Sequence, residues 1–483
     1  MPHSSLDHRA AASGPMLHRL HLRWRKRGGR ELVLGTCGLG LLLLAVVLTV
    51  GSRVGRSIHG GAGTGVGSPG DGLVPLTLVR NARDRGAVCL DGSPPAYHID
   101  RGFGTGMNNW VIHLQGGGWC SSVASCSLRK TTMFGSSDYM ERQVAFNGIL
   151  SRNQSQNPDF YNWNRVVLRY CDGASFSGNV ETEIQVVHNV AGSISKIVNL
   201  CCPCYLLLFD FSVRNVTVES LCTLVMYQDG TKLFFRGQRI WEVIMDELMT
   251  CGLASAKQAL LTGCSAGGLA TFIHCDDFRA RLSKGVTVKC FADAGFFLDI
   301  KDISGKRTMR SFYHDVVNLQ GVANNLPKDC ISRTEPSQCF FPQEIIMSIS
   351  TPLFVLNPTY DFWQVQHILA PEGSDPTGSW LKCKHDIHNC DSNQIEVLQG
   401  FRRAMVDALS SFRDKKDGGI FLNSCYIHCQ TVSNITWHSP SSPRVGNKTI
   451  AEAVGDWYFN RGVVEAIDCP YPCNPTCYDM KFD

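Results

Sequence analysis

The sequence predicts an α/β fold, in which a mainly parallel sheet is covered by helices on both faces. The first observation is that short apolar runs alternate with amphipathic stretches along most of the chain, as in strands joined by crossover helices. The second is the composition of the 483 residues, 44% hydrophobic and 18% charged, which suffices for a large core. The net charge of +4 is slight for this length and argues against a dedicated nucleic-acid-binding protein.

The elements of this fold are expected in a regular order. Buried strands that end in loops are predicted within residues 109–118, 165–173, 258–262, 286–295, 351–361 and 419–429. The stretch 241–249, WEVIMDELM, has apolar residues at helical spacing. In a parallel sheet, reactive groups gather where strands end and loops begin.

The N-terminal region predicts export. Residues 1–31 form a basic tail, and the apolar stretch Leu32 to Val50 carries no charge and is long enough to cross a bilayer as a helix. We interpret it as a transmembrane signal anchor, with the tail in the cytosol and the rest of the chain outside. A long signal peptide that is cleaved is the alternative. Residues 51–72 are glycine-rich and are expected to be a linker, followed by one globular catalytic domain over 73–483.

Cysteines and glycosylation motifs agree with an oxidising compartment. The chain has 22 cysteines, a density unusual for the cytosol. The pairs Cys120/Cys126, Cys330/Cys339 and Cys383/Cys390 could close short loops, although spacing leaves the connectivity open. Four sequons for N-glycosylation begin at Asn153, Asn215, Asn434 and Asn447.

The stretch LLTGCSAGGLATF, residues 260–272, contains the candidate nucleophile, Ser265. This serine follows a predicted strand and precedes a predicted helix, the context of a nucleophile elbow. Gly263 and Gly267 leave room around the turn. The competing interpretation is a glycine-rich bend with an ordinary serine.

The stretch HLQGGGWC, residues 113–120, is the candidate oxyanion loop. The amides of Gly117 and Gly118 are predicted to stabilise an oxyanion together with the amide of Ala266, the residue after the nucleophile. A dinucleotide-binding loop is disfavoured because G-x-G-x-x-G is absent, and a simple turn remains the alternative.

An acid and a base are expected after later strands. Asp361 is preferred as the acid, with Asp293 as its rival, and His428 is preferred as the base over His438. His428 follows the last predicted strand and stands between Cys425 and Cys429, which in this compartment suggest disulfides rather than zinc ligands. The order Ser265, Asp361, His428 is that of α/β-hydrolases.

Six ordered motifs together resemble the plant pectin acetylesterases, a carbohydrate esterase family, and more distantly the animal Notum-type carboxylesterases. They are GGGWC, RYCDGASFSGN, GCSAGGLATFIHCDDF, FADAGFF, NPTYDFWQ and CYIHCQ, and the resemblance extends from about Val74 to the C-terminus. It implies an α/β-hydrolase-like fold in which Ser265, Asp361 and His428 form the triad and Gly117, Gly118 and Ala266 the oxyanion positions. It also implies hydrolysis of acetyl esters in cell-wall pectin without a metal or organic cofactor.

Two features depart from the family pattern. Family members commonly begin with a cleavable signal rather than an anchor. An atypical insertion at 183–228 separates DGASFSGN from LFFRG and looks more like translated non-coding sequence than a structured module. Deleting it is expected to raise soluble yield or activity. Two rival functions stay open: a carboxylesterase acting on xylan or acylated protein, and a wall-binding form whose catalysis the insertion has impaired.

Overall fold

The computed structural model describes residues 72–186 and 231–482. The predicted basic tail, the membrane segment at 32–50 and almost all of the linker lie outside the described residues, as does most of the insertion. No helix within the described ranges is long and apolar enough to cross a membrane.

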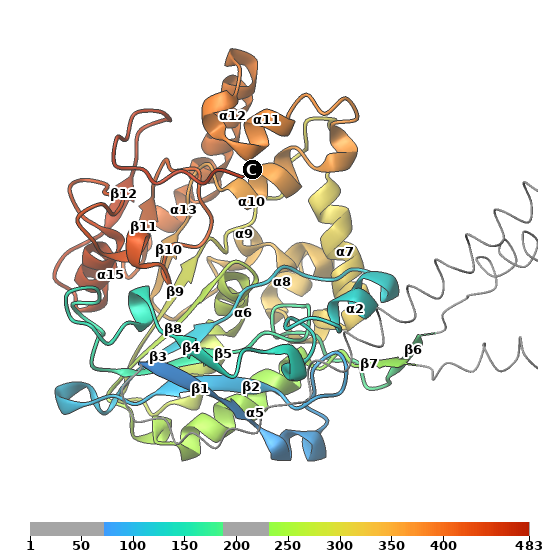
Figure 1. Cartoon of the computed structure of the whole chain (residues 1–483), viewed down its shortest axis with the longest axis vertical. Coiled ribbons are helices and arrows are strands. Elements are labelled where there is room, and N and C mark those ends of the chain that lie inside the picture. Colours follow the sequence, from blue (N-terminus) through green and yellow to red (C-terminus); the bar gives the residue numbers. More distant parts are fainter. Residues whose placement is uncertain (1–71, 187–230, 483) are drawn as a thin grey trace, which may run out of the picture. The chain divides into compact units, whose positions relative to one another are not determined.

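A ten-stranded sheet forms the centre of the described domain (Figure 1). In spatial order its strands are β12 (Glu465–Ile467), β11 (Gly419–Leu422), β10 (Leu353–Leu356), β9 (Thr287–Asp293), β8 (Gln258–Cys264), β3 (Asn109–Leu114), β5 (Asn164–Leu168), β2 (Ala96–Asp100), β1 (Leu73–Leu78) and β4 (Gln143–Ala145). Neighbours from β12 to β5 are parallel, and those from β5 to β4 are antiparallel. The predicted mainly parallel sheet is confirmed.

Side chains from alternate positions of the central strands enter two separate hydrophobic clusters. In β10, Leu353 and Val355 belong to one cluster, whereas Phe354 and Leu356 belong to the other. This follows from the two-residue period of a strand, which sends successive side chains to opposite faces. Both faces are buried, as the near-continuous apolar runs of these strands predict.

Helices cover both faces. They are α2 (Val123–Arg129), α5 (Gly237–Thr250), α6 (Ala266–Arg281), α7 (Thr308–Gln320), α8 (Lys328–Ile331), α9 (Pro342–Ile345), α10 (Phe362–Gln364), α11 (Leu381–His385), α12 (Ser392–Ala408), α13 (Ser410–Arg413), α14 (Asn434–Trp437) and α15 (Ile450–Tyr458). The apolar sides of α5, α6, α7 and α12 enter the first cluster. α15 packs in the second, against the other face.

The six strands expected from apolar runs are present as β3, β5, β8, β9, β10 and β11, and the predicted helix at 241–249 lies within α5. The expectation that β11 is the last strand is wrong, because β12 follows it at the edge of the sheet. Its three residues are all at least partly exposed, so it lacks the apolar run of a buried strand. Two further short strands, β6 (Ile184–Val186) and β7 (Thr231–Leu233), form an antiparallel ribbon; β6 lies at the start of the predicted insertion and β7 follows its end.

Eight disulfides cross-link the described domain. They are Cys89–Cys171, Cys120–Cys126, Cys264–Cys429, Cys275–Cys290, Cys330–Cys339, Cys383–Cys390, Cys425–Cys477 and Cys469–Cys473. The three short loops suggested by spacing are among them. This number of disulfides fits a protein of the secretory pathway.

Candidate active site

Ser265 occupies a one-residue turn between β8 and α6. Its backbone has φ 59° and ψ −125°, a strained conformation for a residue with a side chain. The flanking glycines have no room for side chains: a Cβ atom on Gly263 would lie 2.2 Å from the carbonyl oxygen of Gly267. One on Gly267 would lie 2.0 Å from the carbonyl oxygen of Leu114. This is the geometry of a nucleophile elbow.

His428 and Asp361 meet at the same edge of the sheet. Asp361 follows β10 and His428 follows β11, and Nδ1 of the histidine lies 2.7 Å from Oδ2 of the aspartate. Asp361 is fully buried, and its Oδ1 accepts a hydrogen bond from the amide of Gln364 at 3.1 Å. On the other side of the ring, His428 Nε2 is buried without a hydrogen-bond partner among the described residues. That nitrogen is therefore free to act on another group.

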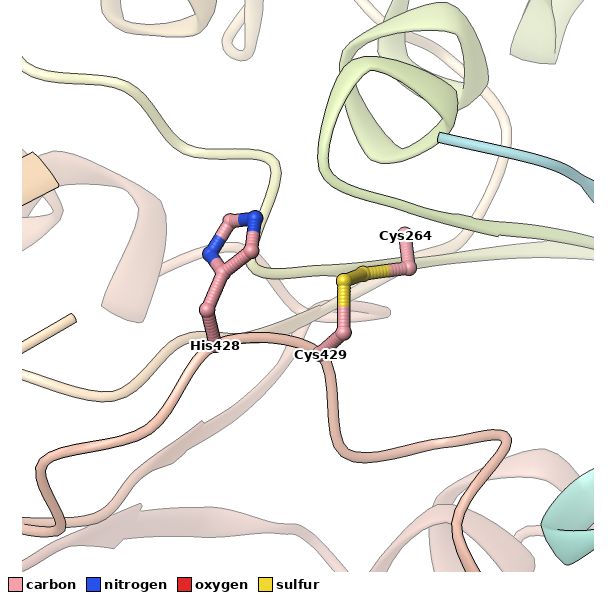
Figure 2. A group of neighbouring side chains, drawn as sticks. All are labelled: Cys264, His428 and Cys429. Atoms are coloured by element: carbon pink, nitrogen blue, oxygen red, sulfur yellow. A yellow bond between two sulfur atoms is a disulfide. The ribbon is translucent and has the colours of Figure 1, made fainter. Parts of the chain in front are cut away.

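A disulfide joins the loop of Ser265 to the loop of His428. Cys264 immediately precedes Ser265, Cys429 immediately follows His428, and the two cysteines are bonded to each other beside the imidazole (Figure 2). A ring nitrogen of His428 lies within 4.8 Å of both sulfur atoms. Because these sulfurs form a disulfide, they offer no thiolate for a metal. The link places Ser265 and His428 at the same point on the sheet edge although 165 residues separate the cysteines.

The two rival residues have other partners. Asp293, at the end of β9, accepts hydrogen bonds through Oδ2 from the amides of Gln430 and Thr431 and from the Thr431 hydroxyl, at 2.7–2.8 Å. Burial raises the pKa of this carboxyl group to about 6. It holds the loop that carries His428 without a hydrogen bond to the imidazole. His438 Nδ1 lies 3.0 Å from the hydroxyl of Thr449, which caps α15.

The glycine-rich loop after β3 lies against Ser265. A Cβ atom on Gly116 would stand 2.8 Å from the Cβ of Ser265, so only glycine permits this approach. Gly117 and Gly118 have φ angles of 147° and 64°, a region that favours glycine. Ala266 begins α6, whose first amides have no acceptor within the helix. Gly117 and Gly118 thus directly follow the glycine that approaches Ser265, and Ala266 directly follows the serine itself.

A family model described as Pectinacetylesterase matches residues 68–194 and 223–478. The chain belongs to the pectinacetylesterase family. It is 54% identical to Pectin acetylesterase 5 of Arabidopsis thaliana over 415 residues, which cover 86% of this chain and 87% of that protein. It is 48% identical to Pectin acetylesterase 4 of the same plant over 405 residues, 84% and 88% of the two chains.

A more distant similarity links the chain to animal enzymes. Palmitoleoyl-protein carboxylesterase NOTUM of Mus musculus is 25% identical over 422 residues, covering 82% of this chain and 70% of that protein. Together with the family match, this makes the chain a carboxylic ester hydrolase with the α/β-hydrolase-like fold that its motifs predict. The pectinacetylesterase model leaves out residues 195–222, which lie inside the atypical insertion.

Several side chains beside His428 were not found by sequence reasoning. The rings of Trp363 and Phe297 lie 6.2 and 6.4 Å from that of His428, centre to centre, and Trp119 packs edge-on against both aromatic residues. These rings place apolar surface beside the imidazole. No local pattern marks them, since aromatic residues also fill ordinary cores. The cysteines beside Ser265 and His428 were visible, but nothing in their spacing pairs them.

The glycosylation motifs differ in accessibility. Asn153 and Asn447 are exposed. Asn434 is half-buried, and its side-chain nitrogen, the atom to which a glycan attaches, donates to Oδ1 of Asn147 at 3.0 Å. Asn215 lies outside the described residues. Glycosylation at all four positions stays a prediction.

Proposed function

We propose that this chain is a serine esterase that hydrolyses acetyl esters of pectin (homogalacturonan) in the plant cell wall and releases acetate. Its relatives at 43–54% identity are named pectin acetylesterases, and they align with more than four fifths of this chain. The observation that carries the mechanism is the His428–Asp361 pair, in which Nε2 of the histidine is free. A disulfide links the loop of His428 to the residue before Ser265.

The proposed reaction begins with proton transfer to His428. Asp361 accepts the Nδ1–H hydrogen bond, which leaves Nε2 as the unprotonated nitrogen. Nε2 takes the proton of Ser265 as its oxygen attacks the acetyl carbonyl, and amides of the glycine-rich loop and Ala266 stabilise the oxyanion. The imidazolium then gives its proton to the sugar oxygen as the bond between that oxygen and the acetyl carbon breaks, so the sugar leaves as an alcohol and the acetyl group stays on Ser265. Water, deprotonated by His428, attacks the acetyl-enzyme and releases acetate with regeneration of Ser265.

Acetate release by the purified full chain tests this assignment. Ser265→Ala and His428→Gln are each expected to lower kcat on acetylated pectin by about 10⁴-fold or more, since triad members act as a unit. His438→Gln is the matched control, because this histidine contacts the cap of α15 and should leave kcat unchanged. Full activity in Ser265→Ala would remove the serine from the nucleophile role. Greater activity on acetylated xylan or a long acyl ester than on pectin would contradict the substrate assignment.

We also propose that residues 32–50 anchor the enzyme in the membrane and place its catalytic domain outside the cell. The uncharged stretch behind a basic tail supports this orientation. Alkaline carbonate extraction of the full chain from membranes is the test: an anchored protein stays in the pellet, whereas a cleaved one is released.

A further inference from the structure

The motif RYCDGASFSGN contributes no residue to the triad, yet its backbone is unusual. Ser175 and Phe176, neither of them glycine, have φ angles of 54° and 58°. Tyr170 and Ser175 are fully buried. Strained backbone of this kind persists only where surrounding contacts hold it, and it clusters near functional sites. The contacts of this segment lead to the glycine-rich loop.

Tyr170 binds the carbonyl oxygen of Gly118. Its hydroxyl donates to that oxygen at 2.8 Å and accepts a hydrogen bond from the amide of Ser175 at 2.9 Å. Burial raises the pKa of Tyr170, so the hydroxyl keeps its proton and remains a donor. The Ser175 hydroxyl in turn accepts a hydrogen bond from Nε1 of Trp119 at 2.8 Å. The Gly118–Trp119 segment is thus held both by its backbone and by its side chain.

Arg129, from the end of α2, binds the preceding carbonyl. One guanidinium nitrogen, Nη1, donates to the oxygen of Gly117 at 2.7 Å, and Nε donates to the oxygen of Phe134 at 2.9 Å. The guanidinium carbon lies 4.9 Å from the ring centre of Tyr170 and 5.4 Å from that of Phe134. Two consecutive carbonyl oxygens of the loop are therefore held by two side chains in contact with each other, the buried Tyr170 and the half-buried Arg129.

Holding these carbonyls fixes the direction of the next amides. In a planar trans peptide the C=O and N–H bonds point in opposite directions. Binding the oxygen of Gly117 therefore turns the N–H of Gly118 away from Arg129, and binding the oxygen of Gly118 turns the N–H of Trp119 away from Tyr170. Throughout the described part of the chain, the amides of residues 116–119 have no protein acceptor. Their neighbours differ: the amides of Gln115 and Cys120 donate to backbone oxygens at 3.1 and 3.2 Å.

We propose that Arg129 and Tyr170 are positioning residues that aim the free amides of Gly118 and Trp119 at the oxyanion formed on Ser265, so that Trp119 takes the place of the predicted Gly117 as a donor. The inference rests on the proposed serine-esterase function. Since Gly116 packs against Ser265, the loop held by these two side chains borders the nucleophile. Donors fixed before the reaction need no reorganisation in the transition state, which is the source of oxyanion stabilisation.

The test uses the full chain with Tyr170→Phe, which removes only the hydroxyl and keeps the ring. Tyr458→Phe is the matched control. Its hydroxyl is also buried, but it lies 3.4 Å from the carbonyl oxygens of Ala259 and Thr287, near the amino ends of β8 and β9 and so opposite the catalytic edge. We would measure kcat and KM on 4-nitrophenyl acetate, the affinity for a trifluoromethyl ketone whose serine adduct carries an oxyanion, and thermal unfolding.

Tyr170→Phe is expected to lower kcat by about 10- to 100-fold, less than the full loss of one oxyanion donor, with KM changed less than about twofold. Affinity for the ketone should fall by the same factor, because its adduct needs the same amides. Tyr458→Phe should lower only the unfolding temperature. Arg129→Lys, which keeps the charge but loses the planar fork, should give a smaller loss of the same kind, and it serves as the test if Tyr170→Phe does not fold.

The outcomes separate this inference from the proposed function. A folded Tyr170→Phe enzyme with unchanged kcat, or with reduced kcat and full affinity for the ketone, would show that these hydrogen bonds hold only the fold. Absence of acetate release by the wild-type chain would overturn the esterase assignment itself, and the inference with it.

Discussion

Removing the Cys264–Cys429 disulfide should affect stability and catalysis together. The double variant Cys264→Ala/Cys429→Ala opens a cross-link between residues 165 positions apart. Loop-closure entropy for that separation gives a stabilisation of about 5 kcal/mol, an upper value because smaller disulfides already shorten the loop. For a domain of this size the unfolding temperature should fall by about 6 °C.

The same variant should lose activity because the Cys264–Cys429 disulfide joins the residue before Ser265 to the residue after His428. A relative displacement of about 1 Å between Ser265 and His428 is expected to cost about 100-fold in kcat. The control is Cys383→Ala/Cys390→Ala, which opens a separation of 7 at α11. It should cost about 2 kcal/mol and leave kcat unchanged.

The assay combines calorimetric unfolding under non-oxidising, metal-free conditions with acetate release from acetylated pectin. The positioning argument would fail if the folded Cys264→Ala/Cys429→Ala enzyme kept the wild-type kcat. It would also fail if both double variants lost activity to the same extent, since the effect would then reflect general loosening.

Two further predictions concern Asp293 and the insertion. Burial raises the pKa of Asp293 to about 6, so between about pH 4 and pH 6 the folded state holds a proton that the unfolded chain has released. Stability should therefore fall by roughly 3 kcal/mol as pH rises through this window. In Asp293→Asn, the free energy of unfolding measured in urea at pH 4 and at pH 6.5 should lack that part of the decline. A difference between the two pH values equal to that of the wild type would contradict this prediction. Because Val186 pairs with Thr231 in the β6–β7 ribbon, replacing residues 187–230 by Asn-Gly closes a two-residue hairpin. This replacement should raise soluble yield or activity, and the idea fails if neither changes.

Local patterns were sufficient to predict the central strands and the position of Ser265. The strands β3, β5, β8, β9, β10 and β11 are buried on both faces, and such strands read as continuous apolar runs. The elbow was visible because its glycines stand two residues before and two residues after the serine, although the contact that excludes a side chain at Gly267 comes from Leu114, far away along the chain. By contrast, β12 has three partly or largely exposed residues and left no comparable pattern.

The sequence by itself determined which chemical groups are available and in what order: a serine in an elbow, carboxylates after two strands, histidines after another, and a glycine-rich loop. Tertiary structure decided which of them meet. It brings Asp361 to His428 and gives Asp293 to the backbone of Gln430 and Thr431. It also pairs Cys264 with Cys429 and brings Arg129 and Tyr170 to the carbonyl oxygens of the glycine-rich loop after β3. The physical reason is that these contacts join residues far apart along the chain, so their distances depend on strand order and loop path, which no local pattern encodes.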